Sequence, residues 1–116
     1  CSSDLIPESI GKLKNLRTIS FMKNNIKKLP KSITKLSGLR HLNLQFNPLE
    51  ELPKDIGNIT QLRVLNIRDT FIKNIPESFY ELFSKPSFKF LNIQGCDIPQ
   101  DQIDKLIKLN KYSLIK

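Results

Sequence analysis

The chain has 116 residues and a formal net charge of +8 at pH 7, from 19 Lys and Arg against 11 Asp and Glu. Its length suits one domain or a piece of one. It holds no apolar run of about eighteen residues, which excludes a membrane-spanning helix within it. From Ser9 to Leu49 there are nine basic residues and no acidic one. Such a stretch favours either solubility alone or attraction to nucleic acid, anionic lipid or an acidic partner.

The first residue is Cys1, followed by Ser-Ser-Asp. This start resembles a mature bacterial lipoprotein, in which the leading cysteine carries the lipid, so Cys1 is a candidate lipidation site. The alternative is a fragment of a longer repeat array. A lipoprotein would be associated with a membrane in the bacterial cell envelope. Without the lipid, we expect a cytoplasmic protein. The sequence leaves both open.

Three stretches of the chain share one spacing of apolar residues. Leu39, Leu42, Leu44, Asn47 and Leu49 follow the pattern L-x-x-L-x-L-x-x-N-x-L, and Leu52-Pro53, Ile56 and Ile59 come next. The same frame starts 23 residues earlier at Leu16 and again at Leu62. A fixed period of this size indicates a solenoid. The alternation around Leu42 and Leu44 predicts a short half-buried strand, and the recurring proline predicts the first turn of a helix.

These motifs resemble the leucine-rich repeat family, in its 23-residue form with L-P-x-x-I-G-x-L in the second half. The resemblance covers nearly the whole chain and implies an α/β solenoid. In such a fold short parallel strands line the concave face, and short helices or turns form the convex face. We expect a partial repeat over 5–15, with Ile10 and Leu13 facing inward. Complete repeats are expected over 16–38, 39–61 and 62–87, a fourth that leaves the repeat frame early over 88–98, and a C-terminal cap over 99–116.

One polar position recurs at the end of each predicted strand. A buried turn needs partners for its backbone N–H and C=O groups, and an Asn side chain can supply both donors and an acceptor. We therefore expect a structural ladder, in which Thr replaces part of that bonding and Cys much less. We also expect a buried Cys96 thiol that forms no disulfide with Cys1. The ladder consists of Asn24, Asn47, Thr70 and Cys96.

The third repeat is longer, at 26 residues. The excess predicts a convex helix that begins near Glu77 and ends before Pro86, with Phe79, Leu82 and Phe83 in the core. The segment from Pro99 predicts an amphipathic capping helix with Asp97 as a possible N-cap and with Ile103, Leu106 and Ile107 on one face. Residues 112–116 are consistent with one extra strand.

The resemblance places ligands on the concave face, where exposed strand residues form columns. These are Thr18, His41, Val64 and Phe90; Ser20, Asn43, Asn66 and Asn92; and Met22, Gln45, Arg68 and Gln94. A basic column, Arg17, Arg40, Arg63 and Lys89, runs beside them and suits carboxylate or phosphate. At the strand exits stand Lys23, Phe46, Asp69 and Gly95, with Phe71 just beyond. Generic solvated side chains are the alternative for the Arg and Asn columns, and packing on the next coil is the alternative for Phe46 and Phe71.

Enzyme signatures are missing from the sequence. It has one histidine, no Gly-rich phosphate loop, no H-E-x-x-H and no C-x-x-C. We therefore expect no enzyme, no cofactor and no metal site. The adjacent Lys27-Lys28, Glu50-Glu51 and Lys73 predict ion pairs between repeats.

The sequence thus favours a protein-binding module whose partner contacts the concave strand face and the strand-exit edge. Exposed aromatic residues and Arg supply interface hot spots. No specific nucleic-acid partner is expected, because the basic residues are not interleaved with stacking aromatics. The alternatives are a surface lipoprotein with an adhesion role and an electrostatic binder of anionic polymer or membrane. The candidate partner-binding residues are His41, Gln45, Phe46, Arg68, Asp69, Phe71, Phe90, Arg40 and Arg63.

Overall fold

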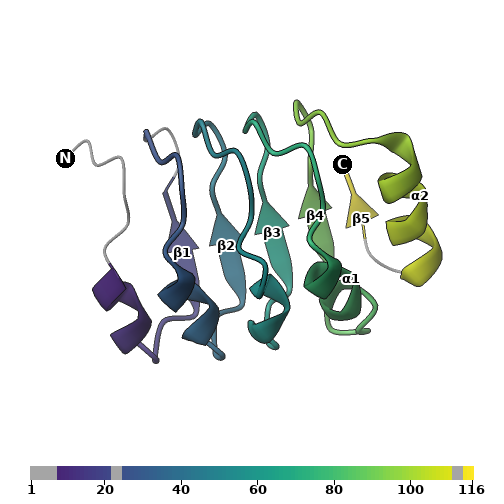
Figure 1. The fold of residues 1–116 in the computed structure, drawn as a ribbon. Helices are drawn as coiled ribbons and strands as arrows, with labels where there is room; N and C mark the ends of the chain where they lie inside the picture. The colour runs from purple at the N-terminus through teal and green to yellow at the C-terminus, as the bar shows by residue number, and fades with distance from the viewer. Residues whose placement is uncertain (1–7, 22–24, 111–113) are drawn as a thin grey trace.

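A computed structural model describes residues 8–21, 25–110 and 114–116. Five short strands form one parallel sheet in which the order in space is the order in the chain. They are β1 (Thr18–Ser20), β2 (His41–Asn43), β3 (Val64–Asn66), β4 (Phe90–Asn92) and β5 (Leu114–Ile115). Figure 1 shows them side by side, with a helical segment after each of the first four, drawn nearer the viewer than the strands. The predicted solenoid is confirmed, including the extra C-terminal strand.

The strand register places equivalent residues of successive coils next to each other. Thr18 pairs with His41, His41 with Val64, and Val64 with Phe90. Leu42 and Leu65, which alternate with these outward residues, are at most 1% exposed. Two of the predicted columns, the one from Thr18 to Phe90 and the one from Ser20 to Asn92, are therefore aligned in register, because side chains alternate between the two faces of a strand. Asn92 is buried rather than exposed.

The convex side begins as single turns of 3-10 helix and becomes α-helical later. Glu8–Lys12, Lys31–Lys35 and Ile56–Asn58 are 3-10 helices, whereas α1 spans Glu77–Phe83. Pro30 and Pro76 stand directly before two of them in extended conformation, where a missing N–H costs nothing. The longer third repeat thus accommodates the predicted α-helix.

An aromatic cluster fills the space under α1. The rings of Phe79 and Phe88 are 5.5 Å apart and nearly perpendicular, and Phe83 lies 5.8 Å and 5.1 Å from them. All three side chains are at most 1% exposed. Edge-to-face contacts of this kind add to the burial of apolar area. These aromatics are core, as predicted.

The helix α2 (Gln100–Leu109) lies at the C-terminal end of the row of coils, beside β4 and β5 (Figure 1). Its buried anchor is Leu106, but Ile107 is 49% exposed, so the predicted apolar face is narrower than expected. The Asp97 cap is also wrong: the helix begins after Pro99, and no side chain caps it. At the other end, Leu13 is 55% exposed instead of facing inward, because the 3-10 helix before it ends at Lys12.

The structural ladder is present in the coils that the structure describes. Asn47, 2% exposed, accepts from the Ile26 N–H at 3.2 Å and donates to the carbonyls of Phe21 at 2.7 Å and Leu44 at 2.9 Å. Thr70 donates to the Ile67 carbonyl at 2.8 Å. Each such bond satisfies a backbone group at a buried turn.

Cys96 departs from the prediction in its burial, because its free thiol is half-buried rather than buried. The thiol donates to the Ile67 carbonyl at 3.0 Å and so takes part in the ladder. Asn24 lies outside the described residues. The predicted ion pairs between repeats are wrong, since the salt bridges within the described ranges are Arg68–Asp69 and Lys105–Glu77.

Candidate functional site

The concave face carries a shallow groove of about 460 Å³ over β1, β2 and β3. His41 is exposed at its centre, and Val64 lies half-buried on the next strand. Phe90 continues the same column on β4. The groove therefore combines one imidazole with the apolar Val64 and with the polar side chains of Thr18, Ser20, Asn43 and Asn66, held at the spacing of about 4.8 Å between neighbouring strands.

The asparagines of the strands have a structural role that the sequence reasoning did not assign. The side-chain oxygen of Asn43 accepts from the Gln45 N–H at 3.2 Å, Asn66 from the Arg68 N–H at 3.1 Å, and Asn92 from the Gln94 N–H at 3.0 Å. This local bond to the residue two positions on is the Asx turn. The repeated L-N-L or L-N-I in the sequence was the available signal. The turns fix where the backbone of Gln45 and Arg68 leaves the sheet.

The residue after each of these turns has a left-handed backbone. Phe46 has a φ of 63°, Asp69 of 55° and Gly95 of 78°. Glycine adopts this conformation freely, but a bulky aromatic residue rarely does. Phe46 nevertheless holds it, with its side chain 39% exposed. Strain of this kind occurs most often at functional positions.

Phe46, Arg68 and Asp69 form a group that we call the exit cluster. The Arg68 guanidinium carbon lies 5.8 Å from the centre of the Phe46 ring, within cation–π range. The Arg68 Nε donates to the Asp69 carboxylate at 3.2 Å. Both charged side chains remain more than 40% exposed, so the ion pair itself contributes little to stability. Its effect is to orient the guanidinium above an exposed ring.

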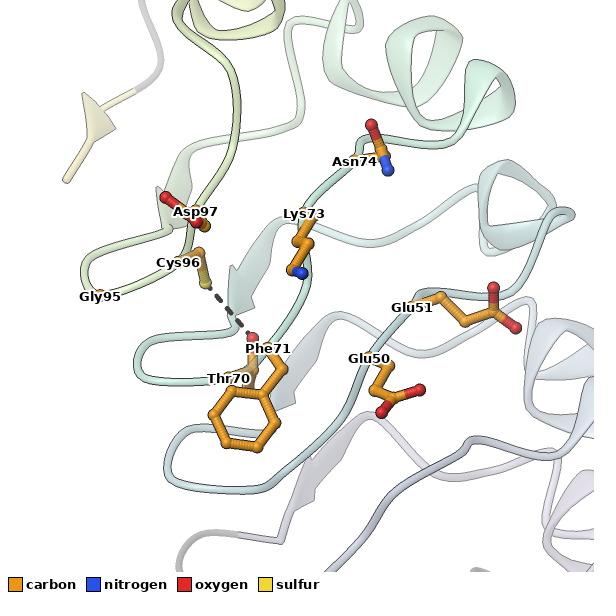
Figure 2. A pocket seen from close by; sticks show the side chains of 9 residues that line it. All are labelled: Glu50, Glu51, Thr70, Phe71, Lys73, Asn74, Gly95, Cys96 and Asp97. Atoms are coloured by element: carbon orange, nitrogen blue, oxygen red, sulfur yellow. Dashed lines mark hydrogen bonds between the residues drawn. The ribbon is translucent and has the colours of Figure 1, made fainter.

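Phe71 lies past the exit cluster, in a groove of about 820 Å³ between the segments that leave the strands (Figure 2). Its ring is 60% exposed, and its N–H donates to the Leu49 carbonyl of the preceding coil at 2.8 Å. The backbone of Phe71 thus ties it to the neighbouring coil, while most of its side chain faces solvent. Glu50, Lys73 and Asp97 add charges of both signs around it.

Arg40 and Arg63 both lie where their strands begin, at the end of the sheet opposite to the exit cluster. The Arg40 N–H donates to the Arg17 carbonyl at 2.7 Å and the Arg63 N–H to the Arg40 carbonyl at 2.8 Å, directly before the strands begin. Six residues separate Arg40 from Phe46, a reach of up to about 20 Å in extended chain. The structure thus brings Gln45, Phe46, Arg68 and Asp69 together and keeps the two arginines apart from them.

Some predicted features lie elsewhere. Cys1, Met22 and Lys23 lie outside the described residues. Tyr80 on α1 has a raised pKa, mainly because it is buried and also because of the charges of Glu77 and Asp101. It is on the convex side. In the part of the chain that the structure describes, no three metal-binding side chains come together, and no helix has the length and apolar character needed to cross a membrane.

Comparison with known proteins agrees with this architecture. The family model described as leucine-rich repeat region matches residues 31–116, and the leucine rich repeat model matches residues 3–49. No curated protein is significantly similar to the chain.

Three solved structures illustrate the likeness. An internalin (InlF) from Listeria monocytogenes has a TM-score of 0.81 at 16% identity, covering 96% of this chain and 31% of its own. A leucine-rich repeat protein of Leptospira interrogans has a TM-score of 0.73 at 23% identity, covering 96% of this chain and 33% of its own. The plant peptide hormone receptor RGFR1, in complex with RGF2, has a TM-score of 0.75 at 27% identity over 99% of this chain.

The chain spans only 19% of that receptor and about a third of the two bacterial chains. The fold is nevertheless common to all three, and the matched model covers most of the sequence. The chain belongs to the leucine-rich repeat family.

Proposed function

We propose that this chain is a non-catalytic module that binds a protein partner across its concave strand face and the strand-exit edge. The residues that would contact the partner include His41, Gln45 and Phe90 on the concave face, the exit cluster, and Phe71 beyond it. The binding mechanism is complementarity of shape and charge on a rigid surface, because the strand register and the Asx turns fix each side chain in advance.

The observation that carries the proposal is the position of Phe46. A left-handed backbone costs a bulky residue on the order of 1–3 kcal/mol, and the ring at this position is only partly buried in return, since Phe46 is 39% exposed. Arg68 lies over the same ring. An aromatic and an arginine that are exposed together are the residue types that dominate interface energies. The left-handed turn recurs at Asp69 and Gly95 and therefore belongs to the fold. What favours a partner-binding role is that this turn carries an exposed aromatic ring next to an arginine.

The likeness to the plant peptide hormone receptor supports a protein or peptide partner. That receptor structure contains RGF2. Leucine-rich repeat domains typically bind proteins, and this chain offers the same row of parallel strands. The identity of the partner is a separate question.

The test is capture of partners from an extract of the cells that make the protein, with quantitative mass spectrometry. The immobilised chain is compared with the double variant Phe46→Asn and Arg68→Gln. We expect the variant to lose at least about tenfold of the specific partner, as for other interface hot spots. Asn suits a left-handed backbone, so the variant should fold.

The matched control is Lys31→Gln with Lys35→Gln, two exposed residues on the convex side. It should retain the partner. Thermal unfolding of all three proteins shows whether each is folded. If the exit-cluster variant melts like the wild type and captures the same proteins in the same amounts, the proposed function is wrong.

A further inference from the structure

The four segments that lead into β1 to β4 share a composition that differs from the rest of the surface. Residues 13–17, 36–40, 59–63 and 84–89 contain six basic residues and no acidic one. We call this surface the entry edge. Its basic residues are Lys14, Arg17, Arg40, Arg63, Lys85 and Lys89.

Backbone hydrogen bonds align four of these cations in a row. The Arg40 N–H bonds the Arg17 carbonyl, the Arg63 N–H bonds the Arg40 carbonyl, and the Lys89 N–H bonds the Arg63 carbonyl, at 2.7–2.8 Å. Neighbouring members of the row are therefore about 4.8 Å apart along the solenoid at the backbone. A cleft of about 380 Å³ opens beside Arg17 and Arg40, next to Lys14 and Gly38.

The charges of this row are not neutralised within the described part of the chain. The salt bridges there join Arg68 to Asp69 and Lys105 to Glu77, neither of which involves the entry edge. Arg17, Arg63 and Lys89 are exposed and Arg40 is half-buried. Like charges at this spacing repel one another, and an anion bound along the row would relieve the repulsion.

We infer that the entry edge binds an acidic segment of the protein partner, in extended conformation, running across the strands. This inference rests on the proposed function and names the chemistry of the partner. From Arg17 to Lys89 the row spans about 14 Å at the sheet spacing, and three carboxylates at alternate positions of an extended peptide span about 13 Å. The guanidinium group can bind each carboxylate through two parallel hydrogen bonds.

The entry edge has no surface on which bases could stack, which favours an acidic peptide over single-stranded nucleic acid as its ligand. Single-stranded nucleic acid is held by exposed aromatic side chains as well as by cations. The only aromatic residue in the four segments is Phe88, which is 1% exposed and packs against Phe79 and Phe83. The entry edge therefore offers charge and hydrogen-bond donors without a platform for bases.

The probe is a synthetic, fluorescently labelled peptide of about seven residues in which Glu alternates with Ser. Binding is measured by fluorescence anisotropy to the intact chain at low and moderate salt. We expect the triple variant Arg17→Gln, Arg40→Gln, Arg63→Gln to weaken binding by at least about tenfold, since hydrogen bonds to charged groups are the strong ones. The matched triple variant Lys27→Gln, Lys28→Gln, Lys31→Gln removes the same charge and should change binding less than about twofold.

Two further probes complete the test. A peptide with Gln in place of Glu should not bind. A single-stranded oligonucleotide and vesicles containing phosphatidylserine should bind more weakly than the acidic peptide, without discriminating between the two triple variants. Equal weakening by both variants, equal binding of the Gln peptide, or tighter binding of the oligonucleotide or vesicles would each overturn the inference.

The outcome is separable from that of the proposed function. Phe46→Asn lies at the other end of the strands and should leave binding of the peptide unchanged. If the acidic peptide fails to bind while partner capture still depends on Phe46 and Arg68, the inference about the entry edge is wrong and the proposed function stands.

Discussion

Asn47 accepts a hydrogen bond from the backbone N–H of Ile26, which lies 21 residues earlier and one coil away. The same side chain donates to the Phe21 carbonyl of that earlier coil. One amide group therefore ties two coils together at a turn that water does not reach. In a solenoid such contacts between neighbours supply the stability that a central core supplies elsewhere.

Asn47→Ala should accordingly be the most damaging polar substitution on the ladder. It leaves the Ile26 N–H and three carbonyls, those of Phe21, Leu44 and Gln45, without this partner, and we expect a loss of roughly 3 kcal/mol in the free energy of unfolding. Urea denaturation measures it. Asn43→Ala, which removes one half-buried bond to the Gln45 N–H, should cost about 1 kcal/mol. Equal losses would show that burial of the Asn47 turn is not what matters.

Gly57 and Gly38 provide a matched pair on the return segments. A Cβ on Gly57 would collide with the backbone carbonyl of Ser78 in the next coil, whereas a Cβ on Gly38 would sit 3.6 Å from the nearest atom, the Lys14 carbonyl oxygen. Gly57→Ala should therefore destabilise by about 1–3 kcal/mol through overpacking, and Gly38→Ala should be nearly neutral. Thermal melting of the two variants side by side decides the matter; a neutral Gly57→Ala would mean that the coils separate easily.

Phe46, Asp69 and Gly95 form a column of residues with a left-handed backbone, the left-handed column. Substitutions at its two ends, Phe46 and Gly95, should differ in their effect on stability. Gly95→Ala places a Cβ where the φ is 78° and against the Asp69 carboxylate, so we expect a loss of about 1–2 kcal/mol. Phe46→Gly relieves a strained φ of 63° and should change stability by less than about 1 kcal/mol, since relief and lost burial offset each other. Chemical denaturation compares them. A large loss at Phe46 would indicate that its ring is a packing residue.

Tyr80 predicts how stability depends on alkaline pH. Its pKa is raised in the folded protein, first by burial and then by Glu77 and Asp101, so the unfolded chain loses the phenol proton first. Folded stability is therefore intact below the ordinary tyrosine pKa of about 10 and falls as the pH rises above it. Tyr80→Phe, which keeps the ring under the Lys105 ammonium, should flatten this decline. Unfolding free energies at increasing pH above neutrality measure the slope, and an unchanged slope in the variant would contradict the assignment.

The regular part of the fold was predictable because one physical rule repeats. The spacing of Leu39, Leu42 and Leu44 placed β2, and the shift of 23 residues placed β1 and β3. The register followed, and with it the concave columns. Prolines and the longer third repeat predicted α1. These features depend on local alternation and on burial between neighbouring coils, both of which are written in the apolar pattern.

The details that depend on packing at the ends and in the turns were not predictable. Leu13 and Ile107 are exposed although both occupy apolar positions of the sequence pattern, because the pattern does not say how the first and last helical segments pack. The left-handed backbone at Phe46 could not be predicted either, because this conformation is normally expected at Gly or Asn. The stacking of Arg68 on Phe46 follows from that backbone, and so it emerged only in three dimensions. The prediction of ion pairs between repeats was wrong because neighbouring positions in the register do not by themselves bring long, exposed side chains into contact.

The left-handed column shows how much the side chain at one position of the repeat can vary. Phe46, Asp69 and Gly95 occupy equivalent positions with nearly the same φ, although one is aromatic, one is anionic and one has no side chain. The same backbone turn therefore forms around three different side chains, although a residue other than glycine strains it. Each coil can thus carry its own group at this position while the strand behind it keeps its register. The row of strands is common to the repeats, and the group presented to solvent at the strand exit is what differs from coil to coil.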